Sequence, residues 1–215
     1  MQNKNKKYNN NLEILYSREK IDYTKAMIFL ENRVARIVEN QEKELIWFLE
    51  HPSIYTSGRS HFESNKHISN IPVQNTTRGG KITWHGPGQL VCYFVVDISK
   101  RKKDIRKFIT VIENSIIETL KDFKIISFSD RKNIGIWVLD KKEEKKIAAI
   151  GFRVKKWIAF HGFSLNLSNN LNSYKKIIPC GISDKGISKI DNFKKISKVK
   201  IINRLKINLI RNLKY

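Results

Sequence analysis

Cysteine is scarce in this chain of 215 residues, which contains only Cys92 and Cys180. Two isolated thiols do not make the dense disulfide framework of a small secreted domain, so we expect both to be reduced. No segment approaches the roughly 18 uninterrupted apolar residues that a membrane-spanning helix requires. The basic residues at the start of the sequence are not followed by an apolar run, so no secretory signal is indicated. These absences predict a cytoplasmic protein that does not enter a membrane.

Acidic residues are also few, since 20 Asp and Glu stand against 42 Lys and Arg and give a formal net charge of +22. Such a charge attracts polyanions or acidic partners at low ionic strength. Biased composition, nucleic-acid binding and docking of acidic proteins all remain open on this ground alone. The basic residues are spread along the chain and form no nucleic-acid-binding motif, so we expect no nucleic acid as a partner.

The patterning predicts one α+β domain over residues 12–215, preceded by a polar tail over residues 1–11. Apolar residues at helical spacing predict amphipathic helices over 22–40, over 104–123 with Asp104 as N-cap, and in the last twenty residues. Apolar and β-branched runs predict strands over 44–51, 90–98, 134–140, 145–154 and 157–167, the first two of them buried, and a short extended segment that begins at Val73. The polar stretches 140–144 and 155–156 are interpreted as turns between the last three strands. Strands and helices mix without strict alternation, which is typical of α+β folds.

The segment RGGKITWHGPGQL, residues 78–90, concentrates four glycines around one arginine and one histidine. Such density indicates either two tight turns or a loop whose backbone approaches a ligand closely. The phosphate-binding pattern G-x-x-x-x-G-K-[ST] fails here, because Ile82 follows Lys81. Composition alone leaves turns and ligand loop equally open.

The five histidines form no metal-binding spacing, and we expect no metal. His85 and His161 each stand beside a glycine, so we expect accessible rings that suit a site, against the alternative of structural imidazoles. Cys92 lies within the apolar run LVCYFVV and should be a buried, inert thiol. Cys180, between Pro179 and Gly181, suits a turn and a partly exposed thiol, although a purely structural cysteine is the commoner case.

Five segments together carry a resemblance to a known family: EHPSIYTSGRS, RGGKITWHGPGQL, KKIAAIGFRV, FHGFSLNL and IPCGISDKGIS. Their order and spacing over residues 12–190 resemble those of the lipoyl(octanoyl) transferases of lipoate synthesis. The resemblance implies the fold of biotin and lipoate protein ligases, a mixed sheet flanked by helices in a single domain.

The same resemblance implies an acyltransferase without a cofactor. It would move an octanoyl group from octanoyl-acyl carrier protein to the target lysine of lipoyl domains, through a cysteine acyl thioester. The acceptors would be lipoyl domains of 2-oxoacid dehydrogenase E2 subunits and the glycine cleavage H protein. Donor and acceptors of this kind are typically acidic, which would give the positive charge a use in speeding their encounter.

Residue by residue, Cys180 matches the family's acyl-accepting thiol and Lys146 matches the lysine paired with it. The matches to the substrate-binding segments are Arg78, Gly79, Gly80, Lys81, Ile82, Thr83, Trp84, His85, Ala149, Ile150, Gly151, Gly162, Phe163 and Ser164.

The chemistry fits these residue types, because a thiolate exchanges thioesters readily and an amine can then cleave the new thioester. One nearby ammonium could lower the pKa of the thiol. Lys145 should point away from Lys146 if both lie on a strand. The glycines at positions 79, 80, 86, 88 and 162 would let backbone lie along the acyl chain, and the role of His85 is open.

Two other functions remain open from the sequence. A lipoate or biotin ligase of the same fold would consume ATP, but PCG and the absence of a G-R-G-R-R-G signature disfavour it. A basic nucleic-acid-binding module would explain the charge but neither the glycine-rich segment nor the cysteine.

Overall fold

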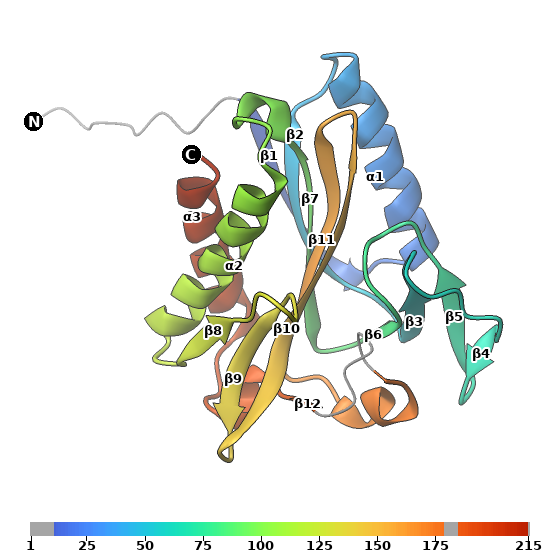
Figure 1. The fold of residues 1–215 in the computed structure, drawn as a ribbon, viewed down its shortest axis with the longest axis vertical. Coiled ribbons are helices and arrows are strands. Elements are labelled where there is room, and N and C mark those ends of the chain that lie inside the picture. Colours follow the sequence, from blue (N-terminus) through green and yellow to red (C-terminus); the bar gives the residue numbers. More distant parts are fainter. Residues whose placement is uncertain (1–10, 179–184, 215) are drawn as a thin grey trace, which may run out of the picture.

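The computed structural model describes residues 11–178 and 185–214, and Figure 1 shows a central twisted sheet with helices on both faces. The strand order in this sheet is β1-β2-β7-β11-β10-β9-β8, and β12 pairs with β10 beside this path. The strands are β1 (Leu12–Lys20), β2 (Glu44–Glu50), β7 (Gln89–Asp97), β8 (Ser127–Ser129), β9 (Ile136–Asp140), β10 (Glu143–Lys155), β11 (Ile158–Asn166) and β12 (Gly186–Ile187). Only β1–β2 and β10–β12 are parallel, so the sheet is mixed, as expected.

Helix α1 (Tyr23–Val38) covers one face of the sheet, while α2 (Ile105–Asp122) and α3 (Lys198–Asn212) cover the other (Figure 1). The central strand β7 is buried on both faces. Its residues Val91, Tyr93 and Val95 pack with α1, and the alternate residues Cys92, Phe94 and Val96 pack with the α2 side. This two-sided burial explains why the run is apolar throughout.

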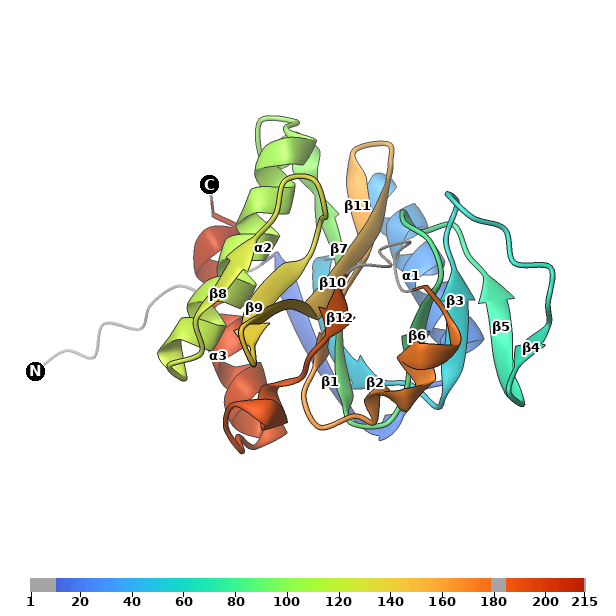
Figure 2. The ribbon, with the colours of Figure 1, turned by 60° about the horizontal axis from the view of Figure 1, so that its bottom comes forward.

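A smaller sheet in the order β4-β5-β3-β6 lies beside α1, as Figure 2 shows. It is made of β3 (Ile54–Ser57), β4 (His67–Ile68), β5 (Ile71–Asn75) and β6 (Thr83–His85). Short 3-10 helices are η1 (Ile98–Lys100), η2 (Leu171–Lys176) and η4 (Ile190–Asn192). The sheet places the glycine-rich segment next to β10 and β11 of the main sheet.

The predicted helices and buried strands are confirmed, including the cap of α2, where the Asp104 side chain accepts a hydrogen bond from Lys107 N (2.8 Å). Two turns were placed wrongly. Glu143 and Glu144 belong to β10, and the first turn is Lys141–Lys142. The second is Lys156–Trp157, which follows β10 directly. All four turn residues have positive φ angles, as two-residue hairpin turns require.

Some expectations fall on residues that the structure does not describe. Residues 1–10 of the expected tail and residues 179–184, which include Cys180, lie outside the described residues. Within the described ranges, no helix has the length and apolarity needed to cross a membrane.

Candidate functional site

Three segments that are far apart in the sequence meet at one cavity on the α1 face of the sheet. We call it the glycine-walled cavity. Its walls are the Arg78–Lys81 loop with β6, the Ala149–Gly151 part of β10, and the Gly162–Ser164 part of β11. Tyr23, Val91, Tyr93 and His161 complete the lining. Substrate-binding segments inferred from sequence therefore surround one hollow, although their role in binding stays a prediction.

Two of the expected binding residues do not reach this cavity. Along β6 the side chains alternate, so Thr83 and His85 face the cavity whereas Ile82 and Trp84 face away. Ile82 and Trp84 instead pack in a separate core cluster with Tyr55 and Tyr174. Since both are buried there, at 7% and 3% exposure, they support the strand rather than line the hollow.

Glycines allow close approach of backbone at the floor of the cavity. Gly151 and Gly162 are opposite each other on β10 and β11, and a Cβ at Gly151 would lie 3.1 Å from Gly79 O. Gly86 and Gly88 do not line the cavity, so their expected contact with an acyl chain stays a prediction that this cavity does not support. They shape the turn from β6 to β7, where Gly88 has a φ of 81°.

Arg78 is buried and fixes the loop at the cavity. Its guanidinium donates hydrogen bonds to Thr56 O (2.6 Å), Thr56 Oγ1 (2.9 Å) and Gly79 O (2.9 Å). Because Thr56 lies on β3, these bonds tie the loop to the smaller sheet. Arg78 therefore contributes a fixed positive charge beside the cavity.

The two histidines expected to have accessible rings are buried instead. His85 is 7% exposed and His161 is 3% exposed, because β7, α1 and the Arg78 loop close over them. Burial lowers the pKa of each to about 3, with the charge of Arg78 adding to the effect. Both imidazoles are therefore neutral at pH 7.

A chain of side chains determines which nitrogen of His85 carries the proton. The carbonyl oxygen of Ser188 can only accept, so Asn166 donates to it through Nδ2 (3.0 Å) and presents Oδ1 to Gln89. Gln89 then donates Nε2 to Asn166 Oδ1 (2.9 Å) and presents Oε1 to His85 Nδ1 (2.8 Å). His85 must donate from Nδ1, and its Nε2 is left as a hydrogen-bond acceptor at the cavity.

His51 lies behind His85, and its hydrogen bonds also determine which ring nitrogen carries the proton. The sequence did not indicate a role for it. His51 Nδ1 donates to Ile21 O (2.6 Å), so its Nε2 accepts from Tyr93 OH (2.8 Å). Burial lowers the pKa of His51 to about 4. The rings of His51 and His85 are 5.9 Å apart. His51 lies in the quoted segment EHPSIYTSGRS, yet only the fold brings it behind the cavity.

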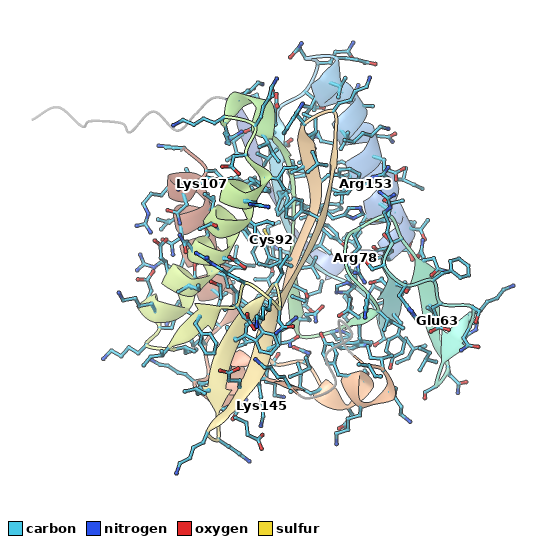
Figure 3. The ribbon with its side chains drawn as sticks, in the orientation of Figure 1. Glu63, Arg78, Cys92, Lys107, Lys145 and Arg153 are labelled. Carbon is cyan, nitrogen blue, oxygen red and sulfur yellow. The ribbon has the colours of Figure 1, made fainter. Side chains whose placement is uncertain are left out.

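Lys146 and Lys145 have different surroundings, as the strand alternation predicted. Lys146 is 4% exposed, donates from Nζ to Ile134 O (3.2 Å) and lies 4.8 Å from the Trp137 ring centroid. Lys145, near the start of β10 (Figure 3), forms an ion pair with Glu143 at 2.9 Å. Among the described residues, no carboxylate pairs with the buried Lys146 ammonium. It lines a groove that shares Gly79, Gly80, Ile150 and Gly151 with the glycine-walled cavity.

Cys92 is a core residue, as expected. It is fully buried between the sheet and α2 (Figure 3), and burial raises the pKa of its thiol well above the usual value. No cluster of three or more His, Cys, Asp or Glu side chains suited to a metal occurs in the described part of the chain.

The mixed sheet, its helices and its cavity define the fold class of the lipoate and biotin protein ligases. The crystal structure of a lipoate-protein ligase A bound with ATP superposes with a TM-score of 0.71 at 15% identity, over 95% of this chain and 85% of that one. The bipartite lipoate protein ligase of Thermoplasma acidophilum, studied with its E2 lipoyl domain, gives 0.70 at 14% identity, over 93% and 83%. At these identities the likeness shows the fold alone.

Sequence comparison is more specific. The model of the lipoyl protein ligase A/B catalytic domain matches residues 22–208. An octanoyltransferase of Ehrlichia chaffeensis is 42% identical over 172 residues, 79% of this chain and 80% of that protein. The chain belongs to the lipoyl protein ligase A/B catalytic-domain family, and within it to the octanoyltransferases, which are acyltransferases of protein lipoylation.

Proposed function

We propose that this protein transfers an octanoyl group from octanoyl-acyl carrier protein to the target lysine of lipoyl domains, through a thioester on Cys180. The observation that carries the proposal is the buried ammonium of Lys146, with which no carboxylate of the described residues forms an ion pair. An ammonium removed from water is costly unless an anion lies nearby. A thiolate at Cys180 would be such an anion, and β12, which begins six positions after Cys180, pairs with β10 at Lys145 and Lys146.

The reaction would proceed in two balanced steps. The Cys180 thiolate attacks the thioester carbonyl of the donor, the octanoyl–sulfur bond of the donor breaks, and the released donor thiolate takes up a proton. The neutral amine of the acceptor lysine then attacks octanoyl-Cys180, forms the amide and releases the Cys180 thiolate. The proton that the donor thiolate takes up in the first step would come from the Lys146 ammonium, and the neutral Lys146 would accept in the second step the proton that the attacking nitrogen loses.

The acyl chain would lie in the glycine-walled cavity, where Val91 and Tyr93 offer apolar contact. Burial of a methylene contributes about 0.8 kcal/mol. The cavity holds about 50 Å³, which is less than an eight-carbon chain needs, so part of the chain would extend beyond it. Acceptors would be lipoyl domains of 2-oxoacid dehydrogenase E2 subunits and the glycine cleavage H protein, in the cytoplasm, and no nucleotide would be consumed.

Intact-mass measurement after incubation with octanoyl-loaded carrier protein tests this proposal. We expect an octanoyl adduct on the wild-type protein and on Cys92→Ala, and none on Cys180→Ser. Lys146→Ala should form the adduct at least about a hundredfold more slowly, the cost of losing the group that ionises the thiol. Lys145→Ala is the matched control and should retain most of the rate. An adduct that survives Cys180→Ser, or equal losses in the two lysine variants, would overturn the assignment.

A further inference from the structure

The groove that Lys146 lines is larger than the glycine-walled cavity and has no part in the mechanism above beyond that lysine. We call it the β10 groove. Its volume is about 610 Å³, and it lies between the start of α2, the segment 132–134 and the second half of β10. The side chains of Ile105 and Ile134 at its rim are 40% and 47% exposed. The groove therefore offers apolar contact to a ligand that reaches the cavity from outside.

One wall of the β10 groove is a strand edge that, among the described residues, has no second strand beside it and is contacted by the Gly79 loop at Phe152. Strand β9 pairs with β10 only as far as Ala148, and from Ala149 to Lys155 the described part of the chain supplies β11 as the only strand partner. The Phe152 carbonyl points outward, because it accepts a hydrogen bond from Gly79 N (3.3 Å). In an antiparallel ladder the main-chain groups of alternate residues point the same way, so those of Ile150 and Val154 also face the groove.

The charge of the β10 groove is of one sign. Arg59, Lys132, Arg153 and Lys146 line it, and no acidic residue does. Although ion pairs are frequent elsewhere in the described residues, none involves Arg59, Lys132 or Arg153. Figure 3 shows Arg153 on the same side of the β10–β11 hairpin as Arg78, and both lower the pKa of His161 through their charge. The groove therefore suits an anionic ligand.

We propose that the β10 groove binds the phosphopantetheine arm of the acyl donor, an inference that rests on the proposed function. The arm is an extended chain with two amides, an apolar dimethyl group and a phosphate at the end remote from the thioester. An amide of the arm pairs with the main chain of Val154, beyond the contact between Gly79 and Phe152, as a peptide adds to a sheet edge. Its dimethyl group contacts Ile105 and Ile134, and its phosphate binds Arg153, with Arg59 and Lys132 nearby.

Binding of the arm in the β10 groove would explain why this groove and the glycine-walled cavity share residues. An arm in the β10 groove brings its thioester to the Gly79–Gly80 and Ile150–Gly151 main chain, where the groove adjoins the glycine-walled cavity. The acyl chain then continues into that cavity and the carbonyl stays near Lys146. A nucleoside triphosphate is the other anion that the charge fits, and competition by ATP against the donor at the concentrations of a ligase substrate would overturn the assignment.

The test compares two small donors, S-octanoyl-4′-phosphopantetheine and S-octanoyl-pantetheine, which differ only in the phosphate. With the wild-type protein we expect kcat/KM to be at least about tenfold higher for the phosphorylated donor, as for a charge-assisted contact. Arg153→Gln should remove most of this preference and leave kcat/KM for the unphosphorylated donor near the wild-type value. Lys155→Gln, an exposed charge on the same strand outside the groove, should keep the preference.

A second pair of variants tests the strand edge. Val154→Pro removes the main-chain N–H that faces the groove. Val154→Ala keeps that N–H and also shortens the side chain, so it is the control. We expect kcat/KM to fall several-fold for both donors with proline and little with alanine. Equal use of the two donors by the wild type, or equal losses for both donors in Arg153→Gln, would refute the arm-binding groove. Failure of both donors to acylate the protein would instead refute the proposed function.

Discussion

The three buried histidines, His51, His85 and His161, should make the free energy of unfolding fall as the pH falls. The pKa values in the fold are about 4 for His51, and about 3 for His85 and His161, all below the ordinary value of about 6.5. Between these values the unfolded chain binds protons that the folded chain does not. Protonation therefore favours unfolding, and stability is lost as the pH falls below about 6.5.

The magnitude follows from the number of sites. Each histidine costs about 1.4 kcal/mol between pH 7.5 and pH 5.5, so the three together cost about 4 kcal/mol. The result does not depend on the particular folded pKa values, provided that they lie below 5.5. The carboxyl groups with lowered pKa, such as Asp140, contribute mainly at lower pH. The loss of stability in this window therefore reports the histidines.

Urea denaturation at pH 7.5, 6.5 and 5.5 measures this loss as a change in the free energy of unfolding. His161→Gln removes one titrating site, so its stability should fall by about 1.4 kcal/mol less than that of the wild type over the same window. A wild-type stability that is flat from pH 7.5 to 5.5, or an unchanged loss in His161→Gln, would refute the reasoning that these imidazoles are held neutral by burial.

Two further predictions concern other buried polar groups. His85→Gln can place an amide oxygen near the position of Nε2, whereas His85→Asn can keep only the contact with Gln89. If the acceptor at the cavity takes part in octanoyl transfer, the glutamine variant should be the more active by about tenfold, and the reverse order would show that only the Gln89 contact matters. Arg101 donates to both carboxylate oxygens of Glu44, at 2.6 and 2.7 Å, and both residues are buried. Arg101→Met should therefore cost about 3–5 kcal/mol of unfolding free energy, and Glu44→Gln in the same protein should restore part of it; no loss in urea denaturation would count against a buried pair.

The spacing of apolar residues along the chain was enough to predict the helices with one buried face and the strands that are buried on both faces. Helices α1, α2 and α3 each have an apolar face at helical spacing, and β2 and β7 are apolar because both faces are covered. Strand β1 escaped prediction because it lies at the sheet edge and is largely exposed or half-buried. Of the smaller sheet, the extended segment at Val73 corresponds to β5, but the sheet itself was not predicted, since strands of two to five residues carry too little periodicity.

The cavity was predicted in part because its residues lie in three quoted segments. The alternation along β6 would already have separated Thr83 and His85 from Ile82 and Trp84, had the strand been recognised. The burial of His85 and His161 could not be foreseen from adjacent glycines, because it depends on α1, which is remote in sequence from both, and on the way the strands pack. The same holds for His51 and Gln89, whose partners only the tertiary structure supplies.

The two fixed histidines limit what the cavity can do to a substrate. His51 and His85 both donate from Nδ1 to fixed oxygen acceptors, so each leaves Nε2 as an acceptor. Tyr93 OH donates a hydrogen bond to Nε2 of His51, whereas no described residue donates one to Nε2 of His85. A neutral imidazole with this tautomer cannot donate a hydrogen bond to a thioester carbonyl. A hydrogen bond to a carbonyl oxygen in this cavity would have to come from another donor, such as a main-chain N–H group or the hydroxyl of Thr83 or Ser164, and His85 Nε2 can bond only a group that carries a hydrogen.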